Sequence, residues 1–216
     1  MVKKSYLSRK ENIILTAVEI MEESGVAQVT IREIARRQGV SEAAIYRHFQ
    51  SKEEIILGVL ERFAAFDRQI METILAQKMG FAPAVIFYCH RLAEYYENYP
   101  AMVSVLLCSD LFYHEEQAAR KWEEIHRHRF DFLIRLAKDA LASGRVTDGW
   151  QAEDLADLVT GFLKERTRRW KADSFAFSLA ASIAGSIQQL LACIAPPEQS
   201  FLTNASQPGP IYLRDR

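Results

Sequence analysis

Apolar residues recur along this chain at spacings of three and four positions, which is the repeat of an amphipathic helix. No segment shows the sustained alternation of apolar and polar residues that is typical of a β-strand. The pattern therefore predicts an all-α fold. The expected helices cover residues 9–23, 31–38, 42–49, 52–79, 84–97, 101–108, 115–142, 152–171 and 175–194.

Polar residues and glycines mark the expected ends of these helices. A serine or threonine followed three residues later by glutamate has the spacing of a capping box, in which each residue bonds the backbone of the other. Three pairs have this spacing: Ser8 and Glu11, Thr30 and Glu33, and Ser51 and Glu54. Ser41 is the expected cap of helix 42–49. Glycine is expected to stop the first two helices, at Gly25 and Gly39.

The spacing of the helices predicts two parts and a tail. Residues 1–55 hold three short helices, and residues 56–198 hold a larger helical body. The helix over 52–79 is long for a globular protein, so it is expected to join the two parts. Gly80 and Pro83 are expected to break the chain after it. Residues 199–216 are polar and rich in proline, which is typical of a flexible tail.

Charge is unevenly distributed between these parts. The 216 residues carry a formal net charge of only −1, so composition alone does not indicate a nucleic-acid partner. Through Lys52, however, nine basic residues face six acidic ones, a balance of +3 that leaves −4 for the remainder. A basic N-terminal head on an acidic body favours a DNA contact through the head.

The segment 30–52 has the organisation of a helix-turn-helix. Two short helices meet at Gly39 and Val40, where glycine can adopt a positive φ. Ile34 and Ile45 lie on the sides expected to pack across this turn. In this arrangement the second helix enters the major groove of DNA.

Two runs carry a resemblance to a known family: Val40-Ser41 through Ile45-Tyr46-Arg47-His48-Phe49, and Ser51-Lys52-Glu53-Glu54. Together with Thr30 to Ala35, they resemble the DNA-binding region of the tetracycline-repressor (TetR) family of bacterial regulators. The resemblance covers roughly the first 60 residues. It implies an N-terminal three-helix helix-turn-helix domain, joined by a long helix to a C-terminal helical domain for ligand binding and dimerisation.

The resemblance also implies which residues contact DNA: Arg32, Ser41, Glu42, Ala43, Ala44, Tyr46, Arg47, His48 and Lys52. Tyr46, His48 and Lys52 match phosphate contacts, and Arg32 matches a position that reaches base or backbone. Arg47 suits either a guanine or a phosphate, and Glu42 either accepts from a cytosine amino group or repels phosphate. Tyr46 as a core aromatic is the alternative. Arg36 and Arg37 are interpreted as a solvated face.

The body is expected to provide a dimer interface and an effector pocket. In the family, the last two helices of each subunit form a four-helix interface, and a near-palindromic operator matches the two-fold homodimer. The candidate interface residues are Leu155, Val159, Phe162, Ala180, Ala184, Ile187 and Leu191. The candidate pocket residues are Phe87, Tyr88, Tyr95, Tyr96, Met102, Phe112, Trp122 and Phe130. Ordinary core packing is the alternative for both sets.

Two basic clusters bear on the ligand. Residues 126–129 read His-Arg-His-Arg, and five Lys or Arg residues lie within 164–171. A buried arginine from either cluster would suit an anionic ligand such as a carboxylate or an acyl thioester. A solvated face is the alternative. His126 and His128 are two positions apart and point to different sides of a helix, so no metal site is expected.

Other functional classes lack a sequence signal. Cys89, Cys108 and Cys193 have neither zinc-ligand spacing nor an even count for disulfides. No cofactor, catalytic motif, signal peptide or membrane span is expected, and the protein is expected in the cytoplasm.

The sequence therefore predicts a one-component repressor that a small, largely apolar effector releases from double-stranded DNA, with an anionic group on the effector as an open alternative. One alternative is a ligand-independent DNA-binding dimer that acts through protein partners. A redox sensor that uses one of the cysteines is another.

Overall fold

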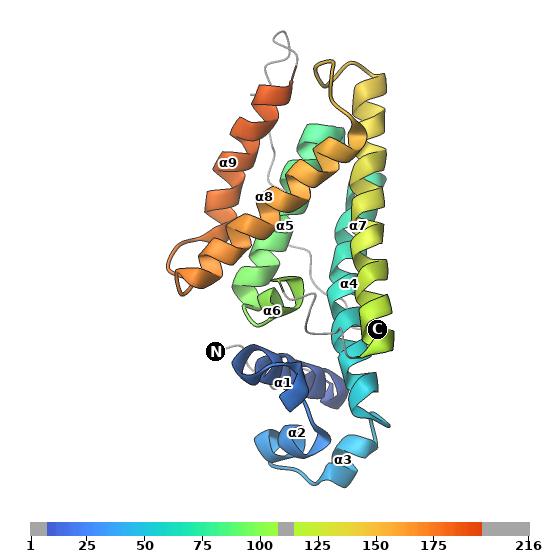
Figure 1. The fold of residues 1–216 in the computed structure, drawn as a ribbon, viewed down its shortest axis with the longest axis vertical. Coiled ribbons are helices and arrows are strands. Elements are labelled where there is room, and N and C mark those ends of the chain that lie inside the picture. Colours follow the sequence, from blue (N-terminus) through green and yellow to red (C-terminus); the bar gives the residue numbers. More distant parts are fainter. Residues whose placement is uncertain (1–7, 108–114, 196–216) are drawn as a thin grey trace.

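The computed structural model describes residues 8–107 and 115–195, and these residues form helices and connecting turns without a strand (Figure 1). The helices are α1 (Arg9–Ser24), η1 (Val26–Gln28), α2 (Ile31–Gln38), α3 (Glu42–Tyr46), α4 (Lys52–Ala76), α5 (Phe81–Asn98), α6 (Met102–Leu107), α7 (Glu116–Ala142), α8 (Ala152–Ala172) and α9 (Leu179–Ile194). The predicted all-α fold is confirmed.

The helices form a small head and an elongated body. In Figure 1, α1, α2 and α3 gather at the lower end, and α4 rises from them along the body beside α7. Within the body, α9 packs on α5, and α8 packs on α7. One continuous hydrophobic core runs through both parts.

The first turns of α4 pack against the head. Gly58 lies there against Ile14 and Phe49, at distances of 3.2 and 3.4 Å from the position that a Cβ atom would take. The close approach of α1 to α4 therefore depends on the missing side chain. The boundary between residues 55 and 56 falls inside α4, and it stays a prediction.

Four helices differ from the predicted limits by three residues or more, and one of them is α4, which ends at Ala76. α3 ends at Tyr46 because residues 47–48 turn and bring Phe49 into the core, where it is 1% exposed. α5 begins at Phe81, before Pro83. Proline fits there because the first-turn amide has no partner within the helix. α9 begins only at Leu179, since Ser174 and Phe175 adopt a positive φ.

The caps agree with the sequence in part. Ser8 and Glu11 form the predicted capping box. Thr30 accepts a hydrogen bond from the Glu33 amide at 3.1 Å. The prediction that the Glu33 carboxylate bonds the Thr30 amide in return is wrong, because Arg36 and Arg37 hold this carboxylate. The Ser41 side chain makes no cap bond. Gly39 takes the expected left-handed conformation, with φ +65°.

Between residues 8 and 107 and between 115 and 195, no helix combines the length and apolar character that a membrane span requires.

Candidate DNA interface

The outer face of α3 consists of side chains that the head leaves exposed. Ile45 is fully buried and anchors the helix, whereas Tyr46 is 53% exposed. Glu42, Arg47 and His48 are also exposed. The exposure of Tyr46 contradicts its alternative interpretation as a core aromatic.

The basic residues of the head differ in whether they are already paired. Among the residues described, the side chains of Arg32, Arg47 and His48 make neither an ion pair nor a hydrogen bond. Arg36 and Arg37, in contrast, both donate to Glu33 at 2.8 Å. Two of the unpaired cations, Arg32 and Arg47, therefore lie on α2 and just after α3.

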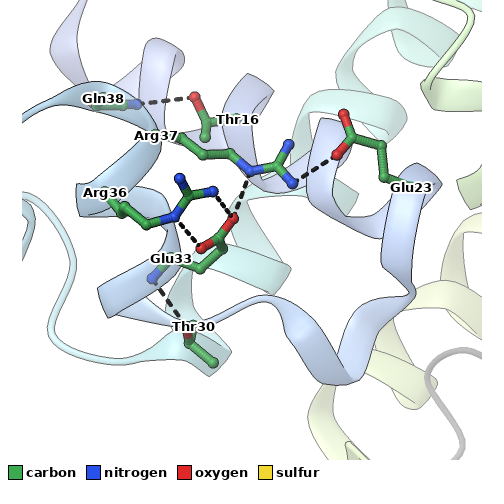
Figure 2. A network of polar contacts seen from close by, with 7 residues as sticks. All are labelled: Thr16, Glu23, Thr30, Glu33, Arg36, Arg37 and Gln38. Atoms are coloured by element: carbon green, nitrogen blue, oxygen red, sulfur yellow. Dashed lines mark hydrogen bonds and ion pairs between the residues drawn. The ribbon is translucent and has the colours of Figure 1, made fainter.

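Arg37 forms a structural connection between two helices, as Figure 2 shows. Its guanidinium donates to Glu33 of its own helix at 2.8 Å and to Glu23 of α1 at 2.6 Å. Beside it, the Gln38 amide donates to Thr16 of α1 at 3.1 Å. The interpretation of Arg37 as a solvated residue is wrong, while Arg36 remains on the surface.

The Arg36–Glu33–Arg37 cluster also changes the acidity of its carboxylate. Hydrogen bonds from Arg36 and then Arg37 lower the pKa of Glu33 from 4.5 to about 2. Hydrogen bonds to Glu23 and then to Glu33 raise the pKa of Arg37. Glu33 is therefore ionised at neutral pH, and it holds the guanidinium of Arg37, which in turn joins α2 to Glu23 of α1.

Lys52 lies at the first position of α4, as the sequence predicts for a phosphate contact. Its ammonium group is 2.9 Å from a carboxylate oxygen of Glu115, the residue just before α7. Both side chains are about one-third exposed. Sequence reasoning missed this partner because 63 positions separate the two residues.

A buried ion pair joins α4 and α7 in the middle of the body. Arg129 donates two hydrogen bonds to the carboxylate of Asp67, and its guanidinium also lies 4.3 Å from the ring centre of Phe63. Burial raises the pKa of Asp67 against the opposing effect of Arg129. The sequence carried a signal for this pair, because each residue is a charge on the apolar stripe of its helix.

Most of the candidate pocket residues are buried in the body. Phe87, Tyr88, Tyr95, Tyr96 and Met102 are at most 8% exposed. Trp122 and Phe130 are half-buried, and Phe112 lies outside the described residues. Tyr95 stacks on Phe66 with ring centres 4.2 Å apart. Its hydroxyl has no hydrogen-bond partner within the described parts of the chain.

Two cavities occur elsewhere in the body. One, of about 280 Å³, lies where α5 begins and α9 ends, beside Arg145 and Val146. The other, of about 380 Å³, lies between the end of α8 and the start of α9, beside Arg166 and Arg169. Neither is lined by any candidate pocket residue.

Comparison with known proteins identifies the helix-turn-helix. Residues 13–59 match the family described as bacterial regulatory proteins, tetR family. This span runs from α1 into α4 and contains the turn at Gly39 and the exposed face of α3. This segment is a DNA-binding domain of the TetR family. The chain is thus a DNA-binding transcriptional regulator, as its residues predict.

Two relatives and one solved structure are similar to this chain over most of its length. The nucleoid occlusion factor SlmA of Marinobacter nauticus is 29% identical over 174 residues, which cover 78% of this chain and 86% of that protein. The fatty acid metabolism regulator protein of Bacillus subtilis is 25% identical over 183 residues, which cover 83% and 91%.

The solved structure is the transcriptional regulator FadR from Bacillus subtilis in complex with stearoyl-CoA. It superposes with a TM-score of 0.69 and 20% identity, covering 84% of this chain and 96% of that one. This likeness shows that the two chains share a fold.

Most of the candidate interface residues of the TetR-family chain are buried within the single subunit. Leu155, Val159, Ile187 and Leu191 are at most 3% exposed, and Ala180 is 8% exposed. Phe162 and Ala184 are half-exposed. The exposed residues of α9 are others: Ala181, Gly185, Gln188, Gln189, Ala192 and Cys193.

The two cysteines that the structure describes differ in their exposure. Cys89 is fully buried, and burial raises the pKa of its thiol to about 12, which disfavours the reactive thiolate. Cys193 is exposed, and Cys108 lies outside the described residues. The described residues contain no cluster of histidine, cysteine and acidic side chains that could hold a metal ion.

Proposed function

We propose that this TetR-family regulator is a repressor that binds a near-palindromic operator as a two-fold dimer and leaves it when an effector occupies the helical body. The observation that carries the DNA-binding part is the exposed face of α3 together with Arg47 just after it, whose side chain has no protein partner among the described residues. A cation without an intramolecular partner can bind a phosphate or a base edge without first breaking another bond.

We assign the roles on this face by their position in the head. Arg47 follows α3 and reaches toward bases or a phosphate, and Tyr46 and His48 contact the backbone. Lys52 binds a phosphate at the start of α4, where free amides and the helix dipole add to its charge. The remaining members of the interface are Arg32, Ser41, Glu42, Ala43 and Ala44, of which Arg32 is on α2.

A dimer follows from the small area of one head. A single helix-turn-helix buries too little DNA surface for specific affinity, so two heads on successive half-sites are needed. We propose that the outward faces of α8 and α9 form the interface. Phe162 and Ala184 contribute to it, together with the small exposed residues Gly161 and Gly185. The buried residues Leu155, Val159, Ile187 and Leu191 support this surface from within the subunit.

The effector belongs in the body, residues 56–198, among the aromatic residues of α5 and α7. Because their side chains are closely packed, an effector must separate them, and such a change moves α4 and the head attached to it. Arg129 favours an anionic group, and an effector carboxylate, or a phosphate on the coenzyme A part of an acyl thioester, would compete with Asp67 for it. The bound stearoyl-CoA of FadR makes a long-chain acyl thioester the first effector to test.

Selection of genomic DNA fragments by the purified chain tests the repressor proposal. We expect a small set of fragments that share a near-palindromic sequence with half-sites about one helical turn apart. Stearoyl-CoA is then titrated onto the labelled operator, with stearate and free coenzyme A as matched controls. Retention of random fragments without a shared sequence would contradict operator recognition, and an operator that stays bound at saturating stearoyl-CoA excludes an acyl thioester effector.

The change Arg47→Ala separates the two roles open to this residue. If Arg47 contacts guanine, the operator is bound more weakly by about 1–3 kcal/mol and the preference at one base pair is relaxed. If it contacts phosphate, affinity falls equally for operator and mixed-sequence DNA. Fluorescence anisotropy with operators substituted at each position distinguishes these outcomes, and equal affinity of the variant and the original chain for all of them removes Arg47 from the interface.

A second candidate function is supported by the similarity to SlmA, a nucleoid occlusion factor. In this alternative the chain is a ligand-independent DNA-binding dimer that acts through protein partners. The burial of the candidate pocket residues agrees with it, since neither of the two cavities described above is lined by them. Binding at many genomic sites, together with a protein that copurifies only when DNA is bound, would favour this function over repression.

A further inference from the structure

Three ion pairs join α4 to α7 along their length. Lys52 pairs with Glu115 at 2.9 Å at the head end, and Lys121 of α7 lies 3.4 Å from Glu61 of α4. The buried pair of Asp67 and Arg129 forms the third connection. The first and third are about 22 Å apart along α4 and about 21 Å apart along α7, so the helices run in register from the head into the body.

The pair of Lys52 and Glu115 differs from the other ion pairs that join head and body. Arg62 of α4 holds Glu11 of α1 at 3.0 Å, and Lys171 of α8 lies 3.9 Å from Glu22. Neither of these cations belongs to the candidate DNA interface. Lys52 does belong to it, so the same ammonium group has two acidic partners, one within the protein and one on the DNA.

We propose that Glu115 lowers the affinity for DNA by competing with a phosphate for Lys52. This inference rests on the proposed role of Lys52 in DNA binding. A carboxylate and a phosphate both accept hydrogen bonds from an ammonium group. When the ammonium group of Lys52 turns toward one of these acceptors, it loses most of its attraction to the other. Glu115 is thus a positioning residue of the body that sets how much positive charge the head presents.

The register of the two helices connects this competition with the effector site. Arg129, the residue proposed to receive an anionic effector, lies on the same helix that Glu115 precedes. An effector that shifts α7 along α4 therefore changes the distance between Glu115 and Lys52. The affinity of the head for phosphate then responds to the body without a change in the helix-turn-helix itself.

The change Glu115→Gln tests this proposal in the full-length chain. The probe is a fluorescein-labelled mixed-sequence duplex, long enough for two heads, because a phosphate contact needs no operator. Half-exposed ion pairs are weak, so the expected gain in affinity is about two- to fivefold. The gain is largest at low salt and shrinks as salt screens the pair. Glu115→Asp is expected to restore most of the original affinity.

Glu116→Gln is the matched control. Glu116 is the next residue, its loss changes the net charge equally, and its carboxylate pairs with Arg120 on the exposed side of α7 at 2.6 Å. We expect it to leave the affinity within the error of the measurement. An equal gain from both variants would show a general effect of charge and would overturn the proposal.

The double variant with Lys52→Ala shows whether Glu115 acts through Lys52. In the Lys52→Ala background, Glu115→Gln is expected to give no gain, because the group for which it competes is absent. A gain of the same size in that background would mean that Glu115 repels DNA directly, and the inference would fail. Thermal unfolding of each variant distinguishes these effects from a loss of fold.

The outcome for Lys52→Ala alone tests the proposed function separately. We expect this variant to weaken binding to all sequences and to reduce the slope of log affinity against log salt by about one unit. An unchanged slope removes Lys52 from the phosphate contacts and with it the basis of the inference. A reduced slope with no effect of Glu115→Gln contradicts only the competition.

Discussion

Arg36 and Arg37 are neighbours in sequence with opposite environments. Both donate to Glu33, yet the Arg36 side chain is 69% exposed, whereas that of Arg37 is 22% exposed and also reaches Glu23. A rotation of about 100° along a helix separates one position from the next, so only one of the two can face α1. Arg37 therefore belongs to the frame of the head, and the nearby free cations Arg32 and Arg47 remain for DNA.

The lowered pKa of Glu33 predicts how pH affects the head. A carboxyl whose pKa is lower in the folded state stabilises that state above its unfolded pKa, and this contribution is lost as pH falls from 4.5 to about 2. The variant Glu33→Gln is expected to melt a few degrees lower at pH 7. The difference from the original chain should narrow on acidification below 4.5, as measured by circular dichroism between pH 7 and pH 3.

Glu19→Gln on α1 is the control for this measurement, since Glu19 makes no ion pair or hydrogen bond among the described residues. It should melt like the original chain at every pH. A difference between Glu33→Gln and the original chain that widens in acid would refute the assigned cause.

The buried pair of Asp67 and Arg129 predicts that changing Arg129 alone lowers the free energy of unfolding more than changing both residues. Arg129→Met leaves an uncompensated buried carboxylate and is expected to lower the free energy of unfolding by about 3–5 kcal/mol. Asp67→Asn combined with Arg129→Met removes both charges and should recover part of this loss. Urea denaturation measures both, with the exposed residue Arg127, changed to Met, as the control. A loss below about 1 kcal/mol for Arg129→Met would show that the pair is not buried in solution.

At the scale of elements, α4 is the helix that connects the head to the body. Its first turns pack on the head through Gly58, and its later turns carry the ion pairs with α7. A helix of 25 residues spans about 37 Å, so a small change at its body end moves the head relative to a second copy. This geometry is the physical basis of the proposed release from DNA.

The turn between α2 and α3 gives a prediction at the same scale. Gly39 adopts φ +65°, and a Cβ atom there would meet no other atom within 4 Å. Gly39→Ala is therefore expected to cost about 1 kcal/mol of stability through backbone strain alone. Gly39→Asn should cost less, because asparagine tolerates this conformation. Urea denaturation compares the two, and an alanine variant as stable as the original chain would contradict the conformation assigned to Gly39.

At the scale of the whole molecule, two heads must be held at a fixed separation, and α8 and α9 offer the surface for this. Gly185 on α9 is exposed, and a Cβ atom added there would meet no atom of another element within 4 Å. A larger side chain at this position can extend into solvent in the single subunit, so we expect it to do harm only where a second copy covers this face. The same absence of contacts holds at Gly161 on α8.

Gly185→Arg is expected to separate the dimer while the subunit stays folded, since arginine favours a helix more than glycine does. Sedimentation velocity should show monomers at concentrations where the original chain is dimeric, and operator affinity should fall by at least tenfold. Ala142→Arg, an exposed change at the end of α7, is the control. A Gly185→Arg dimer as stable as the original would place the interface elsewhere.

The sequence by itself determined which segments are helical and that the head is a helix-turn-helix. Apolar periodicity, the caps at Ser8 and Thr30, and Gly39 act over a few neighbouring positions, so they can be read without knowledge of the rest of the chain. The match to the TetR family has the same local origin, since it spans residues 13–59. The proposed DNA contacts follow from it and stay predictions.

Only the tertiary structure decided which residues pair and what covers each apolar face. Periodicity shows that one side of a helix is buried, but it does not show which element covers that side. Leu155 and Ile187 were therefore assigned to a dimer interface, whereas in the structure they are buried within the subunit, where α8 packs on α7 and α9 packs on α5. The pairs Lys52–Glu115 and Asp67–Arg129 each span more than sixty positions. Such contacts depend on how whole helices pack, because packing brings distant charges into a shared, poorly solvated space.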